Sequence, residues 1–384
     1  MEGLNNFRFI SITVLFILII SFPFINSRIL LVKDAVSTEN RQLSSKPDFD
    51  ITSLDAYPEK YEKYYNDNFS MRNILTKYYN FLCVEAFKKS PYPDKVVIGK
   101  EGWLFPSGNQ IESYKGINRL TTKELEAFRL ELEFRKKYLN QRGCKLYFVI
   151  APDKTNIYSD KIPNTIFRYT KQSWGEQLIE YLNNYSDFKP INIYETLRAN
   201  KKKELLYYKL DHHWNPIGAY YASNVVLNWI HKDFSDVSTN SLNEYNITKI
   251  KTKTGNLINM LGYTGQYYDY TFNLNPKYGY KAVNVPNVGY KVIEGFAYPW
   301  EYEHCKEIIG SNKPKILIIA DSYGDLLFPI LAEHFSRTVK IFDSWQYRLN
   351  EDVVNGEKPD IVLLVALESN MKAMLNNQAR FGNK

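Results

Sequence analysis

The chain of 384 residues is poor in the side chains that build disulfide frameworks, metal sites and nucleotide-binding loops. It has 3 cysteines, none of them in a C-x-x-C pair, and 5 histidines. This scarcity argues against a disulfide scaffold and against a structural zinc site made of cysteines. Neither G-x-x-x-x-G-K-[ST] nor G-x-G-x-x-G occurs, so the sequence predicts no phosphate-binding loop of these types. We expect no cofactor and no metal.

A strong excess of one charge is also missing. The sequence has 49 Lys plus Arg and 42 Asp plus Glu, a net charge of +7. This mild excess is compatible with an anionic partner, but it does not predict nucleic acid. Hydrophobic residues make up 44% and charged residues 24%, which is ordinary for a globular protein of one large domain or two smaller ones. Aromatic residues, at 15%, are unusually frequent, and they include 31 Tyr.

One long apolar run stands near the start of the sequence. Residues 9–25 contain no charged side chain, and Arg8 and Arg28 flank them. The run is longer than a usual signal-peptide core, and bulky residues follow it where a cleavage site would need small ones. We therefore predict a short tail over 1–8 and a membrane anchor over 9–27. A cleaved signal and a buried helix of a globular domain remain the alternatives.

The rest of the sequence divides into a lead-in and a main domain. We expect a stalk and helical lead-in over 28–90, with near-helical apolar spacing at 59–89, and one domain over 91–384. The main domain alternates expected strands and helices, which predicts an α/β fold with a parallel sheet covered by helices on both faces. Its expected elements are a hairpin at 95–105, strands at 145–151, 191–194, 315–320 and 360–366, and helices at 121–141, 173–184, 217–229 and 326–335. The Asn- and Tyr-rich stretch 233–300 is expected to be an antiparallel β-rich insertion.

Two short motifs carry the side chains that nucleophilic catalysis needs. D-H-H-W-N-P at 211–216 leads directly into an expected helix, and A-D-S-Y-G-D at 320–325 joins an expected buried strand to a helix. The end of a parallel strand is where open α/β sheets bind their ligands, and a helix N-terminus stabilises developing negative charge. We therefore predict Ser322 as nucleophile, His213 as base and Asp211 as the residue that orients His213.

Each motif also has a purely structural interpretation. An Asp-Ser pair after a strand is a common helix cap, and an Asp-His-His cluster is a common ligand set for zinc. Trp214 is equally compatible with a core position. Lys154, after its strand, is interpreted either as a solvated charge or as a ligand for an anionic substrate group.

The two motifs resemble those of a known family. The D-x-H-W pattern at 211–214 and the D-S-Y pattern at 321–323 resemble the signatures of the AlgJ/AlgX group, the DHHW-type SGNH-hydrolase-like polysaccharide O-acetyltransferases. The G-K-E-G-W-L-F segment at 99–105 and A-P-D-K at 151–154 add to the likeness, which covers roughly residues 95–370. Ala320 departs from the family pattern, which has Gly at that position.

The resemblance implies an SGNH-like α/β/α sandwich outside the cytoplasmic membrane, in the periplasm or at the cell surface, with the N-terminal helix as a single-pass anchor. It implies a polysaccharide acceptor and a membrane-bound O-acyltransferase that supplies the acetyl group, without nucleic acid. It assigns Ser322, His213 and Asp211 to the catalytic triad. Asn370 is a candidate for the oxyanion hole, and Trp214, Tyr323 and the aromatic residues of 263–270 are candidates for stacking on sugar rings, with Lys154 as a further substrate-binding candidate.

The resemblance favours transfer of an acetyl group through acetyl-Ser322 to hydroxyls of an exopolysaccharide or another cell-surface glycan. The same triad would serve a glycan O-acetyl esterase, because water and a sugar hydroxyl differ only as acceptors. A non-catalytic glycan-binding or scaffold protein with this fold is the third interpretation.

Overall fold

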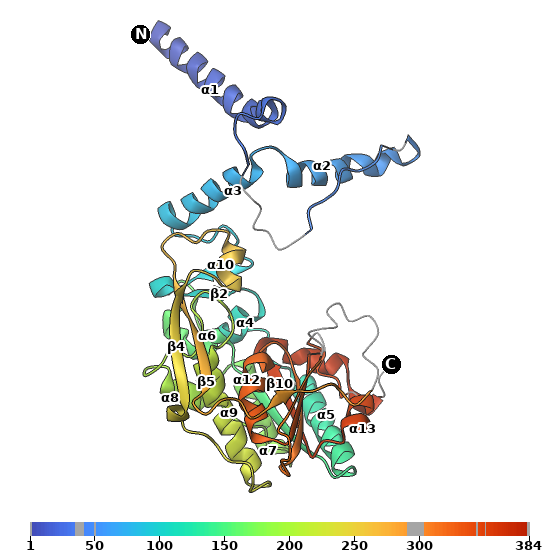
Figure 1. Ribbon diagram of the computed structural model, residues 1–384. Coiled ribbons are helices and arrows are strands. Elements are labelled where there is room, and N and C mark those ends of the chain that lie inside the picture. The colour runs from blue at the N-terminus through green and yellow to red at the C-terminus, as the bar shows by residue number, and fades with distance from the viewer. Residues whose placement is uncertain are drawn as a thin grey trace. The chain divides into compact units, whose positions relative to one another are not determined.

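The computed structural model describes residues 2–34, 42–49, 51–289, 303–342, 345–349 and 351–381 (Figure 1). The end of the expected insertion, residues 290–300, and positions 35–41 and 50 of the expected lead-in lie outside the described residues. The chain forms two compact units. The first comprises Met1–Pro93 with Ile258–Gln266, and the second comprises Asp94–Leu257 with Tyr267–Lys384.

The first unit begins with helix α1, Glu2–Ile29. Its segment Phe7–Ile29 is long and apolar enough to cross a membrane, and only 6% of its most apolar part is buried. A helix that exposes Phe, Ile and Leu along its length needs an apolar surrounding. The predicted N-terminal helix is therefore present, with the properties that a membrane anchor requires.

The lead-in is helical but is interrupted once. Helix α2 spans Tyr57–Asn68, helix α3 spans Arg72–Phe81, and a π-helical turn covers Leu82–Ala86. Met71, between α2 and α3, has a left-handed backbone with φ 66°. The Asp34 carboxylate accepts hydrogen bonds from the backbone N–H groups of Asn73 and Ile74 at the start of α3. Local spacing predicted one run over 59–89 because it carries no information about this contact with Asp34, a residue far away in the sequence.

The second unit contains a six-stranded sheet with the order β3-β10-β8-β9-β7-β6. The four strands from β3 to β9 are parallel, whereas β7 and β6 are antiparallel to their neighbours, so the predicted parallel sheet is the core of a mixed one. The strand bounds in this order are Lys145–Ala151, Ile361–Leu367, Lys315–Ala320, Arg337–Phe342, Glu303–Glu307 and Val283–Asn284.

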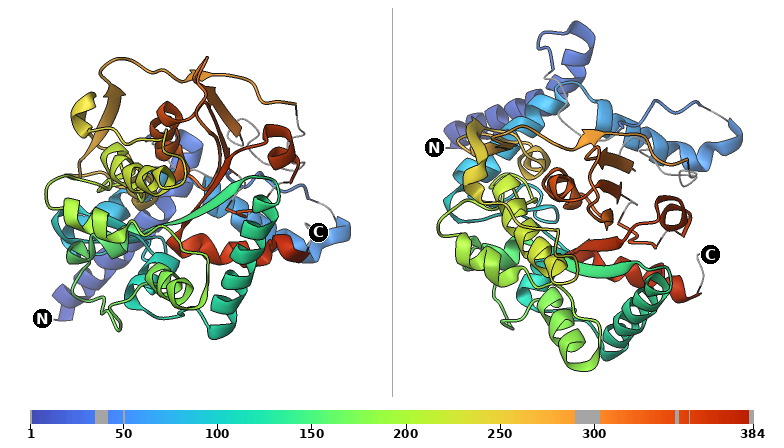
Figure 2. Two further views of the ribbon diagram at one scale, coloured as in Figure 1. Left: turned by 90° about the horizontal axis from the view of Figure 1, so that it is seen from below. Right: turned by 60° about the horizontal axis from the view of Figure 1, so that its bottom comes forward.

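Helices lie on both sides of this sheet (Figure 2). The crossovers β8–α12–β9 and β9–α13–β10 run in opposite directions along the sheet. Right-handed connections therefore place α12 and α13 on opposite faces. The principal helices are α5 Thr122–Asn140, α7 Trp174–Tyr185, α9 Pro216–His231, α12 Gly324–Leu331 and α13 Glu351–Glu357. Shorter helices are α4 Asn109–Lys115, α6 Lys154–Ile157, α8 Tyr194–Asn200 and α10 Asn256–Leu261.

One strand prediction was wrong, and strands β7 and β9 were not predicted. Of the expected strand at 191–194, only Ile191 bridges β3, and Asn192 accepts a hydrogen bond from the Tyr194 N–H that starts α8. Strand β9 was missed because its sequence R-T-V-K-I-F interleaves charged and apolar residues. All six residues are nevertheless buried, since Arg337 pairs with Glu357 and Lys340 pairs with Asp325.

Two antiparallel pairs complete the second unit. The predicted hairpin consists of β1, Val96–Ile98, and β2, Leu104–Pro106. Within the insertion, β4, Tyr245–Thr252, pairs with β5, Asp269–Pro276, as a two-stranded ribbon. The predicted antiparallel character of the insertion is therefore confirmed for its described part.

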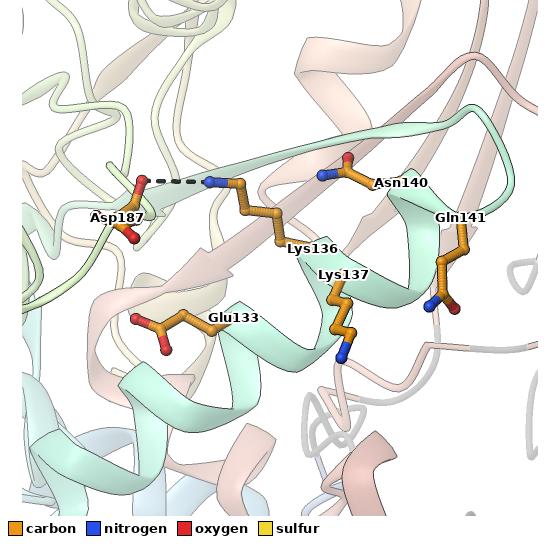
Figure 3. A pocket seen from close by; sticks show the side chains of 6 residues that line it. All are labelled: Glu133, Lys136, Lys137, Asn140, Gln141 and Asp187. Atoms are coloured by element: carbon orange, nitrogen blue, oxygen red, sulfur yellow. Dashed lines mark hydrogen bonds between the residues drawn. The ribbon is translucent and has the colours of Figure 1, made fainter.

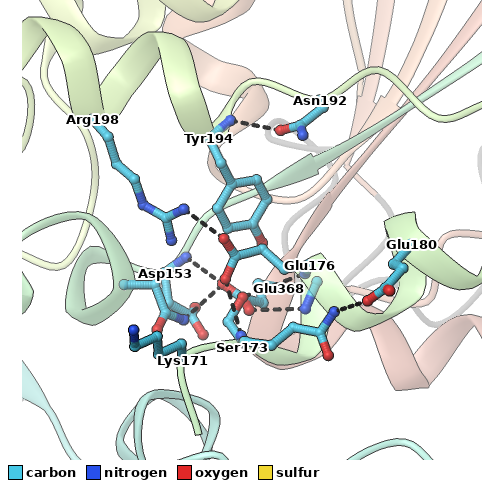
Figure 4. Close-up of polar contacts among 12 residues, drawn as sticks. Asp153, Lys171, Ser173, Glu176, Glu180, Asn192, Tyr194, Arg198 and Glu368 are labelled. Carbon is cyan, nitrogen blue, oxygen red and sulfur yellow. Dashed lines mark hydrogen bonds and ion pairs between the residues drawn. The ribbon is translucent and has the colours of Figure 1, made fainter.

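A buried polar network ties the ends of β3 and β10 to the start of α7, as Figure 4 shows around Glu368, Asp153 and Ser173. The fully buried Glu368 carboxylate accepts hydrogen bonds from the N–H groups of Gly175 and Asp153 and from the Ser113 hydroxyl and the Asn156 amide. Burial, followed by the negative charge of Glu368, raises the pKa of Asp153 well above its usual range. The four hydrogen bonds that Glu368 accepts hold this edge of the sheet in place.

Candidate active site

Ser322 lies on the turn between β8 and α12, at the carboxyl end of a parallel strand as predicted. Asp321, which is fully buried, fixes this turn through both carboxylate oxygens. Oδ1 accepts from the Tyr323 N–H at 2.8 Å, and Oδ2 accepts from the Leu367 N–H at 2.7 Å and from the Tyr347 hydroxyl at 2.6 Å. Gly324 allows the tight turn, because a Cβ there would lie 2.5 Å from the Cβ of Ala320.

The second motif is held by the start of α9. Asn215 caps this helix, its Oδ1 accepting from the N–H groups of Ile217 and Gly218 at 2.9 and 3.0 Å. Pro216 occupies the first helical turn, as its missing N–H and fixed φ predict. Just before the cap, the His213 carbonyl accepts from the Tyr208 N–H at 3.2 Å. The cap and this bond hold the loop of Asp211 and His213 at the start of α9.

The two motifs, far apart in the sequence, meet in one hydrogen-bonded row. Asp211 Oδ1 lies 2.7 Å from His213 Nδ1, and His213 Nε2 lies 2.8 Å from Ser322 Oγ. With Nδ1 protonated toward the carboxylate, Nε2 is left to accept the Ser322 hydroxyl proton. The Ser322 hydroxyl therefore bonds His213. It does not cap helix α12, although an Asp-Ser pair suggested a helix cap.

The electrostatics keep Asp211 ionised. Burial acts to raise its pKa, but the hydrogen bond and charge of His213 and the hydrogen bond from the Asn256 N–H outweigh burial and lower the pKa well below the usual range. Two N–H groups bind this carboxylate, from His213 at 3.0 Å and from Asn256 at 2.8 Å. Asp211 thus presents a fixed negative charge to the imidazole of His213, which stabilises the imidazolium form.

His212 is adjacent but has different properties. Its ring lies 3.8 Å from that of His213, centroid to centroid. Burial, and after it the positive charge of His213, lowers the pKa of His212 to about 3. His212 is therefore neutral at physiological pH, and its backbone carbonyl accepts a 2.6 Å hydrogen bond from the Tyr323 hydroxyl.

Trp214 and Tyr323 connect the two motifs through buried contacts. Both side chains have no solvent-exposed area. Trp214 donates from Nε1 to the Tyr323 carbonyl at 3.1 Å, and the two rings contact edge to face at 5.0 Å. The prediction that these two rings stack on a sugar is wrong, because neither presents a face to solvent. They cross-link the loop of Asp211 and His213 to the turn of Ser322.

Lys154 is also buried, so both interpretations of this residue from the sequence were wrong. Its ammonium donates to the carbonyls of Leu104, Lys209 and Asp211 at 2.5, 2.9 and 2.9 Å. Burial lowers its pKa to about 7, against the opposing effect of the charges of Asp269 and Asp211. Lys154 therefore neither lies in solvent nor faces a substrate. Its hydrogen bonds join strand β2 to the loop that carries Lys209 and Asp211.

A cavity of about 290 Å³ opens over the three residues. Its walls come from the loop of Asp211 and His213, the turn of Ser322 at the start of α12, and the insertion. The lining residues are Tyr208, Asp211, His213, Thr252, Thr254, Gly255, Thr271, Ser322, Asp325 and Leu326. Residues of the insertion and Tyr208 were missed, since no local pattern marks side chains that reach the site only through the fold. Asn370 is not among the lining residues; it lies half-buried in the 3-10 helix Glu368–Asn376.

Two clusters of the described residues have metal-binding side chains close together. Asp211, His212 and His213 form one, but both ring nitrogens of His213 are already engaged with Asp211 and Ser322. Glu303, Cys305 and Glu357 form the other, in which Glu357 also pairs with Arg337. A separate hollow lies along α5, where Lys136 bonds the Asp187 carbonyl (Figure 3). It is lined by flexible charged and amide side chains that do not converge on a point.

The chain is similar to known proteins. Residues 96–287, half of the chain, match the family described as SGNH hydrolase-like domain, acetyltransferase AlgX. A probable alginate O-acetylase AlgJ of Pseudomonas aeruginosa is 26% identical over 167 residues, which cover 41% of this chain and 38% of that protein. The match therefore spans about two fifths of the length of this curated relative.

Solved structures support the fold. The structure of Bacillus cereus PatB1 is similar with a TM-score of 0.53 and 20% identity, covering 76% of this chain and 100% of that one. A DHHW family protein from Eubacterium siraeum is similar with a TM-score of 0.50 and 17% identity, covering 73% of this chain and 95% of that one. At these identities the likeness establishes the architecture, and the chemistry has to be argued from the site.

Proposed function

Because the chain belongs to the AlgX family of SGNH hydrolase-like acetyltransferase domains, we propose that it transfers acetyl groups to hydroxyls of a polysaccharide through acetyl-Ser322. The observation that carries the proposal is the hydrogen-bonded row of Asp211, His213 and Ser322 at the mouth of a cavity. A nucleophile, a base and a carboxylate that orients the base are the requirements of acyl transfer by a serine.

In the first half of the proposed reaction, Ser322 Oγ attacks the carbonyl carbon of the acetyl donor while its proton passes to His213 Nε2. The resulting tetrahedral oxyanion is stabilised by the Ser322 N–H at the start of α12. When the intermediate collapses, the bond to the leaving group breaks and His213 returns the proton to the departing oxygen. Asp211 stabilises the imidazolium throughout.

In the second half, a polysaccharide hydroxyl occupies the place of the leaving group. His213 takes the hydroxyl proton as the oxygen attacks the acetyl carbon, and the same proton then passes to Ser322 Oγ as the ester bond to serine breaks. A water molecule in that place would give acetate instead, which is the esterase reaction. We propose that a membrane-bound O-acyltransferase supplies the acetyl group, and that α1 holds the domain at the membrane beside it.

Acetylation of Ser322 is the first test. The purified chain is incubated with 4-nitrophenyl acetate, and intact and peptide mass spectrometry report acetyl-enzyme. We expect acetate on the peptide containing Ser322 in the wild type and none there in Ser322→Ala. Equal labelling of the two proteins would contradict the nucleophile assignment.

The partition of the acetyl group is the second measurement. Addition of deacetylated polysaccharide is expected to divert acetyl groups from released acetate to the polymer. Release of acetate that no glycan slows would favour the esterase instead, and glycan binding without any turnover would favour a scaffold protein.

A further inference from the structure

The β4–β5 ribbon has one face that leads away from the proposed active site. Thr252 and Thr271 both line the cavity that contains Ser322. In the antiparallel register Ile250 lies opposite Thr271, and alternate residues of each strand share a face. The face that enters the cavity therefore continues along the ribbon. We call it the ribbon face; it consists of Asn246, Thr248, Ile250, Thr271, Asn273 and Asn275.

The ribbon face is open to solvent over positions 246–250, whereas the opposite face packs on the core at Tyr245 and along β5 and is exposed at Ile247, Lys249 and Lys251. Tyr245 and Phe272 on the opposite face are 5% and 7% exposed and belong to the hydrophobic core. On the ribbon face, Ile250 is 56% exposed and both Thr248 and Asn273 are exposed. The side chains of Thr248 and Asn273, which lie opposite one another, make no hydrogen bond to other residues that the structure describes. Their polar atoms are available to a ligand.

The six residues of the ribbon face include no charged side chain. At the cavity end, Asp269 lies opposite Thr252, but it is buried and accepts hydrogen bonds from the N–H groups of Leu210 and Tyr270. The lysines of β4 alternate to the other side, where Lys249 lies 4.0 Å from the ring centre of Tyr270 and Lys251 lies 4.1 Å from that of Tyr268. The rings of Tyr268 and Tyr270 contact these lysines. Their contacts therefore do not favour the expected stacking on sugar rings. A surface for nucleic acid or anionic lipid would present the positive charges instead.

We propose that the ribbon face binds the acceptor as an extended, hydroxyl-rich segment of a polysaccharide, recognised by its hydroxyls and not by charge. Asn and Thr side chains both donate and accept hydrogen bonds, as sugar hydroxyls require. Strand β4 has 8 residues, roughly 27 Å at the usual rise per residue, so the face is long enough for a polymer. A polypeptide strand would pair with an edge of the ribbon, not with its face.

This inference rests on the proposed function, because it places one acceptor hydroxyl at Ser322. The ribbon face is continuous with the cavity, because Thr271 belongs to the face and lines, together with Thr252, the cavity that contains Ser322. A glycan lying along the face would thus be held over several residues while a single hydroxyl enters the cavity. The ribbon would select a chain over a free sugar.

The test uses the full chain in detergent with Ser322→Ala, so that binding is measured without turnover. The probes are an array of neutral and uronate oligosaccharides, followed by titration of the best ligand at low and high salt. The test variant adds Thr248→Ala and Asn273→Ala; the matched control adds Lys249→Gln and Lys251→Gln on the opposite face. We expect the test variant to weaken binding about ten-fold, the loss expected for two hydrogen bonds of modest strength, and the control less than about two-fold. Salt should have little effect.

Equal affinity in the test variant would overturn the inference, and so would binding that collapses with salt or in the lysine control. An array without any bound glycan would overturn it as well. The proposed function is judged separately by acetyl transfer in the Ser322 protein. Glycan binding that depends on the ribbon, without acetyl transfer, would overturn the transferase and retain the ribbon as a glycan site.

Discussion

At the scale of single residues, the proposed reaction depends on three side chains that would act as a unit. Ser322 lacks a base without His213, and His213 has no other catalytic use in the proposed reaction. Their individual contributions are therefore not separable.

We expect Ser322→Ala and His213→Ala each to lower kcat/KM for acetyl transfer by several orders of magnitude, and the double variant to be no worse than either alone. Steady-state release of 4-nitrophenol from the three proteins measures this. Losses that multiply in the double variant would mean that the two residues act independently.

Lys154 gives a prediction about pH. Its pKa is lowered to about 7 in the folded chain, whereas the unfolded value is 10.5, so between these values the unfolded chain binds more protons. This group therefore makes folding less favourable below about pH 7, and stability rises as the pH increases from about 7 toward about 10.

The rise should be smaller in Lys154→Met, which cannot titrate and leaves three carbonyl oxygens without their donor. Urea unfolding of both proteins at several pH values between these limits measures the difference. Parallel stability curves for the two proteins would contradict the assignment of the pH dependence to Lys154.

At the scale of elements, the site is located where loops meet helix starts. Helix α9 begins three residues after His213, at Pro216, and α12 begins two residues after Ser322, at Gly324. Both turns are fixed by an acceptor side chain, Asn215 in one and Asp321 in the other. The start of each helix thus sets the position of a catalytic candidate.

Asn215→Ala should lower the free energy of unfolding by about 1 kcal/mol, as the loss of a helix cap usually does. It should also reduce acetyl transfer, because the loop that carries His213 loses its attachment at the start of α9. Asn215→Ser, which retains an accepting oxygen without a buried charge, is the control and should lose less stability. Thermal unfolding and the esterase assay together test this; an alanine variant as stable as the wild type would contradict it.

At the scale of the whole molecule, α1 leads to a prediction about where the protein is located. We expect the full chain to sediment with membranes and to resist extraction by alkaline carbonate, because a span of this length and apolarity is stable in a bilayer.

Deletion of residues 2–29 should release the protein to the soluble fraction. The full-length Ser322→Ala protein is the control and should remain in the membrane fraction. Ultracentrifugation and immunoblotting measure the distribution, and a full chain that is soluble without detergent would contradict the anchor.

The sequence by itself determined the features that depend on neighbours along the chain. The apolar run predicted α1, uninterrupted apolar residues predicted β3, β8 and β10, and Pro216 predicted the start of α9. The family pattern of D-x-H-W and D-S-Y named the three residues that the fold brings together. These signals are local because hydrophobic periodicity and helix capping act over a few residues.

Only the tertiary structure decided what depends on contacts across the chain. Lys154 and Tyr323 were expected to face solvent or substrate, and Trp214 had both a sugar-stacking and a core interpretation; all three are buried. Trp214 and Tyr323 join the two motifs, and Lys154 joins Leu104 to the loop of Asp211. Strand β9 was hidden because its charges are neutralised by partners from other elements. The insertion's contribution to the cavity was equally hidden. A residue's burial and hydrogen-bond partners are set by segments far away in sequence, and one sequence without its fold does not specify which segments those are.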